Sequence, residues 1–85
     1  MERTILWGAA MPTIAKLGAI QIRIFADDHH PPHFHIWTPD GEALVLIMNL
    51  TVLRGHIRKR DLGLVLTWAE RNMPLLLSEW DRLNG

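Results

Sequence analysis

The sequence contains no cysteine, so neither a disulfide bridge nor thiolate ligation of a metal ion is available to the chain. This absence fits a reducing compartment, and we expect a cytoplasmic protein. No stretch approaches the roughly 20 consecutive apolar residues that a membrane-spanning helix requires, so we expect no membrane association. An excess of one charge sign is also missing, because nine Lys and Arg balance nine Asp and Glu. This balance argues against a general nucleic-acid coat protein, which would be strongly basic.

A chain of 85 residues has room for one domain. The apolar run within residues 1–10 is too short for a signal peptide, so we interpret these residues as an N-terminal extension. A single domain then occupies residues 11–85, and translation would start at either Met1 or Met11. A small domain without disulfides often gains stability from a bound metal or a partner subunit.

Hydrophobic residues alternate with polar ones in two segments, which is the pattern of half-buried β-strands. After an irregular lead-in at residues 11–18, isoleucines occupy one face of residues 20–26. Residues 33–37 alternate again, with Phe34 and Ile36 on one face. The other face of that strand is formed by His33, His35 and Trp37. A continuously apolar strand is expected at residues 43–48, and a short one at 51–53.

From about Lys59 the spacing of the apolar residues becomes helical. Pro74 then predicts the start of a second helix or a kink in one long helix. The sequence therefore predicts an α+β fold, with a three- to four-stranded antiparallel sheet and one or two C-terminal helices packed on one face. The isoleucines and Phe34 would pack against a helical stripe formed by Leu62, Val65, Leu66 and Ala69.

Four of the five histidines lie within seven residues, in the segment His29-His30-Pro31-Pro32-His33-Phe34-His35. Two residues that are two apart on a strand project from one face, about 6–7 Å apart. His33 and His35 therefore form a candidate site for a divalent transition metal such as zinc or nickel. We expect His29 as the third ligand, with His30 or Asp28 as supplements. Catalytic use, phosphate contact and a plain polar surface are the alternatives.

Other polar residues accompany these histidines. Arg23 shares their face of the sheet, which would suit an anion or RNA. Trp37 on that face would stack on a base or a partner, or simply cover the sheet. The basic stretch from residue 54 to residue 60 would contact phosphates or form a solvated surface. Its candidate binding or catalytic side chains are Arg54, Arg58 and Arg60.

One motif resembles a known family. The segment Asp28-His29-His30-Pro31-Pro32-His33-Phe34-His35 is similar to the core motif of a small bacterial family catalogued as domain of unknown function 4160. Met11-Pro12-Thr13-Ile14, Val52-Leu53-Arg54-Gly55 and Trp68-Ala69-Glu70 extend this resemblance over about residues 11–83. It implies no settled activity. It implies instead a small partner protein, because members of this family are often encoded beside a second small protein. Such pairs have been suggested to be toxin–antitoxin modules.

Three hypotheses follow. The first is a toxin–antitoxin component that binds a small partner protein; an RNase-like toxin would use His33 or His35 as general acid or base. Arg58, with Arg54 or Arg60, would then stabilise the charge that develops on the phosphate. The second is a metal-binding module, and the third is a non-catalytic protein-interaction adaptor. Three successive leucines at 75–77 cannot all face one side of a helix, which favours a homo-oligomer or another subunit contact.

Overall fold

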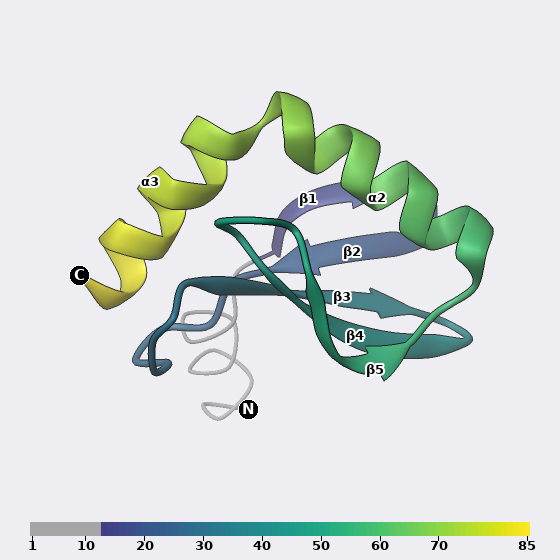
Figure 1. Cartoon of the computed structure of the whole chain (residues 1–85), viewed down its shortest axis with the longest axis horizontal. Helices are drawn as coiled ribbons and strands as arrows, with labels where there is room; N and C mark the ends of the chain where they lie inside the picture. Colours follow the sequence, from purple (N-terminus) through teal and green to yellow (C-terminus); the bar gives the residue numbers. More distant parts are fainter. Residues whose placement is uncertain (1–12) are drawn as a thin grey trace, which may run out of the picture.

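The computed structural model describes residues 13–85. Five antiparallel strands lie in the sheet in chain order, and two helices follow them. Both helices cover the same face of the sheet, so the α+β prediction is confirmed (Figure 1). No helix in this part of the chain combines the length and apolar character needed to cross a membrane. The elements are β1 (Thr13–Leu17), β2 (Ile20–Arg23), β3 (His33–Thr38), β4 (Gly41–Leu46), β5 (Val52–His56), α2 (Lys59–Arg71) and α3 (Met73–Asn84).

The sheet has five strands, where the sequence predicted three to four. The additional strand is β1, which lies in the segment interpreted as an irregular lead-in. Leu17 pairs with Ile20 across the turn between β1 and β2. Gly18 adopts a left-handed φ of 63° in this turn, a conformation that glycine reaches at little cost. Side chains of β1 are exposed or half-buried, so the strand lacks the marked hydrophobic alternation that would reveal it.

Alternation in β2 and β3 places the expected side chains in the core. The inward-facing residues of these strands are fully or almost fully buried, and full burial of such a side chain contributes about 1.5–3 kcal/mol. The helices cover them with Val65 and Ala69 from α2 and with Leu76 and Trp80 from α3. Leu62 and Leu66 of the predicted stripe pack at the border of this core.

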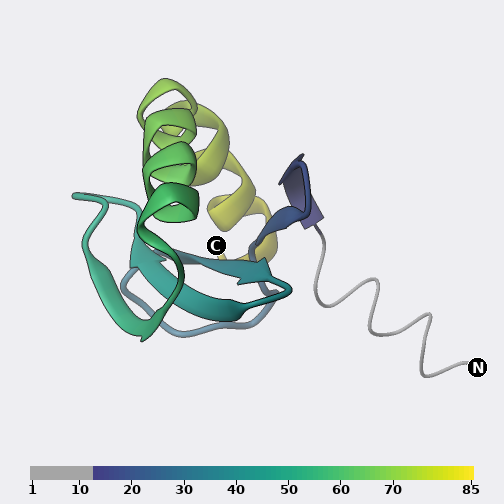
Figure 2. The ribbon, with the colours of Figure 1, turned by 90° about the vertical axis from the view of Figure 1, so that its right-hand side faces the viewer.

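The two helices meet at a break instead of forming one long helix. The side-chain amide of Asn72 donates a hydrogen bond to the backbone carbonyl of Trp68, at 2.8 Å. Pro74 lies in the first turn of α3, where its missing N–H is not needed. The break lets the two helices arch over the sheet, with α3 above the end where β3 begins (Figures 1 and 2).

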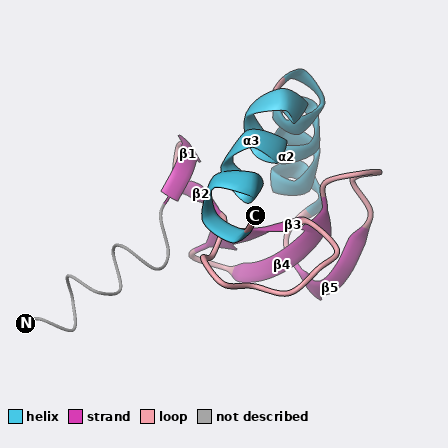
Figure 3. Cartoon of the chain, turned by 90° about the vertical axis from the view of Figure 1, so that its left-hand side faces the viewer, coloured by secondary structure: helices cyan, strands magenta, loops and turns pink. Residues whose placement is uncertain are grey.

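The second face of the sheet carries the polar residues, and no element within residues 13–85 packs over it as the helices do over the first face (Figure 3). Strand register places four residues in one row across this outer face, because Arg23 pairs with His35, His35 with Leu44, and Leu44 with Arg54. A neighbouring row contains Trp37. The expected boundary between residues 10 and 11 lies outside the described residues.

Candidate metal centre

The loop between β2 and β3 returns Asp28 to the histidines at the start of β3. The carboxylate oxygen Oδ2 of Asp28 lies 2.8 Å from Nε2 of His33 and 3.4 Å from Nε2 of His35. The two imidazole centroids are 5.2 Å apart, so His33 and His35 share one face as the strand pattern predicted. One potential ligand atom from each of the three residues lies within 4.8 Å of the others.

The C-terminus of α3 holds this loop in place. The side-chain oxygen of Asn84 accepts a hydrogen bond from the backbone N–H of Asp28 at 2.6 Å, and its amide donates to the carbonyl of Phe25 at 3.0 Å. The backbone N–H of Asp27 donates to the carbonyl of Leu83 at 3.4 Å. Sequence reasoning treated Asn84 only as a helix stop, because nothing local connects it to a loop 56 residues earlier.

His33 is nearly fully buried, beside the ring of Trp80. Its Nδ1 lies 2.8 Å from the backbone carbonyl oxygen of Pro31, which can only accept, so Nδ1 carries a hydrogen. A neutral ring then presents the lone pair of Nε2 to the carboxylate of Asp28, and two acceptors face each other. Either a second proton on the ring or a bound cation resolves this conflict.

His35 is the accessible member of the group, because 26% of its side chain is exposed. Its ring stacks on Phe25 with centroids 4.1 Å apart, which fixes its orientation. Burial lowers the pKa of His35 below its ordinary value, and positive charge on His33 acts in the same direction, whereas the hydrogen bond to Asp28 opposes the shift. The neutral imidazole, which is the form that binds metals, is therefore favoured.

The pKa of Asp28 is also lowered. Burial alone would raise it, but hydrogen bonds from the backbone N–H of His29 and from the rings of His33 and His35 outweigh burial. The N–H of His29 donates to Oδ1 at 2.9 Å, which leaves Oδ2 for the two imidazoles. Asp28 is therefore a carboxylate at neutral pH, as a metal ligand must be.

Two of the three separations between the ligand atoms suit a transition metal ion, and the two imidazole nitrogens lie within 4.8 Å of each other. Metal–nitrogen and metal–oxygen bonds of about 2.0–2.2 Å place neighbouring ligand atoms about 3–3.5 Å apart at tetrahedral or octahedral angles. The two separations from Asp28, 2.8 and 3.4 Å, lie close to this range. The hydrogen bond from Nδ1 of His33 to a backbone carbonyl is the usual support of a metal-binding imidazole. Two histidines and one carboxylate leave further coordination positions open.

The third residue of this group differs from the expected one. We expected His29 beside the two strand histidines, but its side chain is 89% exposed and its Nδ1 approaches the other carboxylate oxygen, Oδ1, at 3.4 Å. His30 packs edge-on against Trp80 instead. The loop conformation turns Asp28 inward and His29 outward, because the backbone of Asp28 is tied to Asn84.

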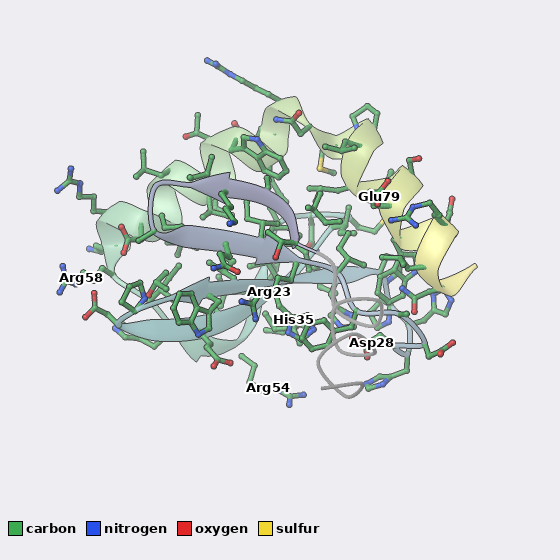
Figure 4. All side chains as sticks on the ribbon, turned by 180° about the vertical axis from the view of Figure 1, so that it is seen from behind. Arg23, Asp28, His35, Arg54, Arg58 and Glu79 are labelled. Atoms are coloured by element: carbon green, nitrogen blue, oxygen red, sulfur yellow. The ribbon has the colours of Figure 1, made fainter. Side chains whose placement is uncertain are left out.

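Two of the predicted binding arginines lie on the same outer face as His35 (Figure 4). Arg23 donates to the side-chain oxygen of Gln21, and its guanidinium carbon lies 5.7 Å from the centre of the Trp37 ring. Arg54 borders an open pocket of about 240 Å³ that begins at His35. The remaining lining residues are Glu42, Ala43, Leu44 and Gly55.

The other two predicted arginines lie elsewhere. Arg58 pairs with Asp40 at 3.2 Å beside the turn that follows β3, and Figure 4 shows it at the opposite end of the molecule from Asp28. Arg60 lies on α2 and borders a groove with the β1–β2 turn. Neither arginine lies near the histidines. Arg58 lies beyond the end of β3, and the histidines lie at its start, with a rise of about 3.3 Å per residue between them. Arg60 lies on α2.

Comparisons with known proteins identify a family without an assigned activity. The comparison with curated proteins found no match, and the comparison with solved structures found none either. A family model described as Domain of unknown function (DUF4160) matches residues 19–81. The matched span contains all three residues of the candidate metal centre and most of both helices. The chain therefore belongs to the DUF4160 family.

Proposed function

We propose that this protein binds a divalent transition metal ion through Asp28, His33 and His35. One observation carries the proposal: the Nε2 atoms of two imidazoles lie close to one carboxylate oxygen of Asp28. In addition, Nδ1 of His33 donates a hydrogen bond to a backbone carbonyl. Imidazole nitrogen and carboxylate oxygen are ligands that zinc and nickel accept. His35 gives this centre its contact with solvent.

A metal-free ion pair between Asp28 and a doubly protonated His33 is the competing account. It satisfies both contacts of His33 and leaves His35 with one long hydrogen bond at 3.4 Å. The two accounts differ in what they predict for added metal. A site with three positioned ligands binds zinc with about one ion per chain, whereas an ion pair gives no saturable binding.

Calorimetric titration with zinc chloride and nickel chloride tests the proposal. The protein is purified without a histidine tag and stripped with a chelator. Substitution Asp28→Asn should weaken zinc binding at least tenfold, because a neutral amide replaces the carboxylate. Asp27→Asn is the matched control. Asp27 precedes Asp28 directly, its side chain is exposed, and its left-handed φ of 57° suits asparagine. Unsaturable binding, or equal loss in both variants, would reject the metal centre.

A second function has separate support in the edge strand β5. All five residues of β5 are exposed, and Val52, Leu53 and the nearby Met48 leave 37%, 53% and 72% of their area in contact with solvent. An open edge strand with apolar side chains can receive an extended segment of another protein. We propose that β5 binds the small partner of a toxin–antitoxin-type pair.

Co-expression with the adjacent open reading frame tests this second proposal. Leu53→Lys should abolish co-purification of that gene product, because a charge replaces an apolar contact on the edge. Leu64→Lys is the control, since Leu64 is equally exposed at 51% but lies on α2. A complex that survives Leu53→Lys and dissociates with Leu64→Lys would place the partner on the helix instead.

A further inference from the structure

The outer-face pocket and the candidate metal centre share His35. One side of the ring faces Asp28, with Nε2 3.4 Å from Oδ2, and the same residue borders the pocket of about 240 Å³ between β3, β4 and β5. The pocket is also lined by Ala43 and Leu44 and by the charged residues Arg54 and Glu42. The pocket lining includes neither Asp28 nor His33, so His35 is the residue that connects the pocket to the candidate metal centre.

The charges around His35 favour an anion once a metal is present. The guanidinium of Arg54 forms no hydrogen bond or ion pair with any group in residues 13–85, and Arg23, one strand from His35, has no carboxylate partner there. Two carboxylates, Asp28 and Glu42, act on His35 and offset these two cations. A divalent ion then leaves an excess of two positive charges. A phosphate monoester carries about −1.5 to −2 charges at pH 7, which matches this excess.

We propose that the pocket binds a small hydroxylated phosphate ester, such as a sugar or polyol phosphate. This inference rests on the proposed metal centre. The phosphate lies between the metal at His35 and the guanidinium of Arg54, whose planar fork suits phosphate oxygens.

Glu42 and the size of the pocket define the rest of the ligand. Its carboxylate repels an anion and can only accept hydrogen bonds, so it faces hydroxyl groups of the ester. A pocket of about 240 Å³ is smaller than the roughly 300–1,000 Å³ of typical drug-sized sites, which favours a small ester over an extended polymer.

Calorimetry with glycerol 3-phosphate tests the inference on zinc-loaded and zinc-free protein. We expect binding to the zinc-loaded form and at least tenfold weaker binding to the zinc-free form. Arg54→Gln should weaken ester binding at least tenfold while zinc binding persists, because Arg54 is not a metal ligand. Arg60→Gln is the matched control, since Arg60 lies on α2 beside the β1–β2 turn. Glu42→Gln should weaken the binding of glycerol 3-phosphate relative to that of phenyl phosphate, which has no hydroxyl group and experiences only the loss of repulsion.

The outcomes separate this inference from the metal proposal. Zinc binding without any binding of glycerol 3-phosphate overturns the ester pocket and leaves the metal centre standing. Absence of zinc binding overturns both. Equal losses in Arg54→Gln and Arg60→Gln indicate general charge attraction and reject the pocket. Binding of an RNA oligonucleotide in place of glycerol 3-phosphate would also overturn it.

Discussion

Asp28 and His35 both hold their protons more weakly in the folded protein than in a free side chain. Hydrogen bonds from His29, His33 and His35 lower the pKa of Asp28 against the opposing effect of burial, and burial lowers the pKa of His35. The unfolded chain therefore binds more protons at these two residues in acid than the folded chain does. Proton binding and unfolding are linked, so acid must destabilise the fold through both groups.

The metal-free protein should lose stability in two steps as the pH falls. His35 contributes the first, which begins near its ordinary pKa of 6.5 and is complete below its lowered folded pKa. Asp28 contributes the second, below its ordinary pKa of 3.8, and its stabilisation is fully present above that value. Urea denaturation at a series of pH values measures both steps. His35→Gln should remove the first step selectively.

His56→Gln serves as the control for this experiment, because His56 ends β5 on the exposed surface. The step assigned to His35 should therefore persist in this variant. A first step that persists in His35→Gln, or that disappears in His56→Gln, would show that another group causes it.

At the scale of elements, α3 supports the candidate centre from outside the sheet. Asn84 links the last turn of α3 to both sides of the β2–β3 loop, through the carbonyl of Phe25 and the N–H of Asp28. Asn84→Ala removes both hydrogen bonds, and each contributes about 0.5–1.5 kcal/mol, so we expect a loss of about 1–3 kcal/mol in the free energy of unfolding. Zinc affinity should fall several-fold, because Asp28 loses its positioning partner.

Arg82→Ala is the matched control in the same turn of α3. Within residues 13–85, Arg82 forms its ion pair with Glu79 on the helix surface, at 2.6 Å, and forms no hydrogen bond to the loop. Zinc affinity should remain unchanged in this variant. Asn84→Asp should have an intermediate effect on zinc affinity. Its carboxylate still accepts a hydrogen bond from the N–H of Asp28 but cannot donate one to the carbonyl of Phe25. Equal zinc affinity in the wild type and Asn84→Ala would show that the loop needs no clamp.

Two glycines in different elements should respond oppositely to alanine. Gly55 in β5 has a φ of 86°, and a Cβ atom there would collide with the backbone carbonyl oxygen of Glu42. Gly55→Ala should therefore cost at least about 1–3 kcal/mol from its backbone conformation alone. Gly63 lies inside α2, where a Cβ would meet no atom within 4 Å, so Gly63→Ala should stabilise the protein by about 1 kcal/mol. Urea denaturation distinguishes the two signs.

At the scale of the whole molecule, periodic hydrophobicity predicted much of the fold. Alternation at residues 20–24 and 33–37 identified two strands and their buried faces, and a helical period predicted α2. The strand pattern also placed His33 and His35 together, which the 5.2 Å separation of their rings confirms. These predictions succeeded because burial of one face imposes its period directly on the sequence.

Long-range contacts explain what the sequence did not predict. The choice of Asp28 over His29 depends on a hydrogen bond to Asn84, 56 residues away. The separation of Arg58 from the histidines depends on which end of β3 each residue reaches. Strand β1 has no fully buried side chain that would reveal it. Local propensity and periodicity contain no information about such contacts.

Metal binding should stabilise the domain as a unit, because the three ligands come from two segments that only the fold brings together. Zinc at 100 times its dissociation constant should add about 2.7 kcal/mol to the free energy of unfolding. A change of 1 kcal/mol shifts the melting temperature of a 60–100-residue domain by about 4–8 °C, so we expect a rise of roughly 10–20 °C. Thermal denaturation followed by circular dichroism measures this shift. A chelator should reverse the rise in melting temperature, and Asp28→Asn should show little of it. A wild-type melting temperature that does not change with zinc would contradict the metal centre.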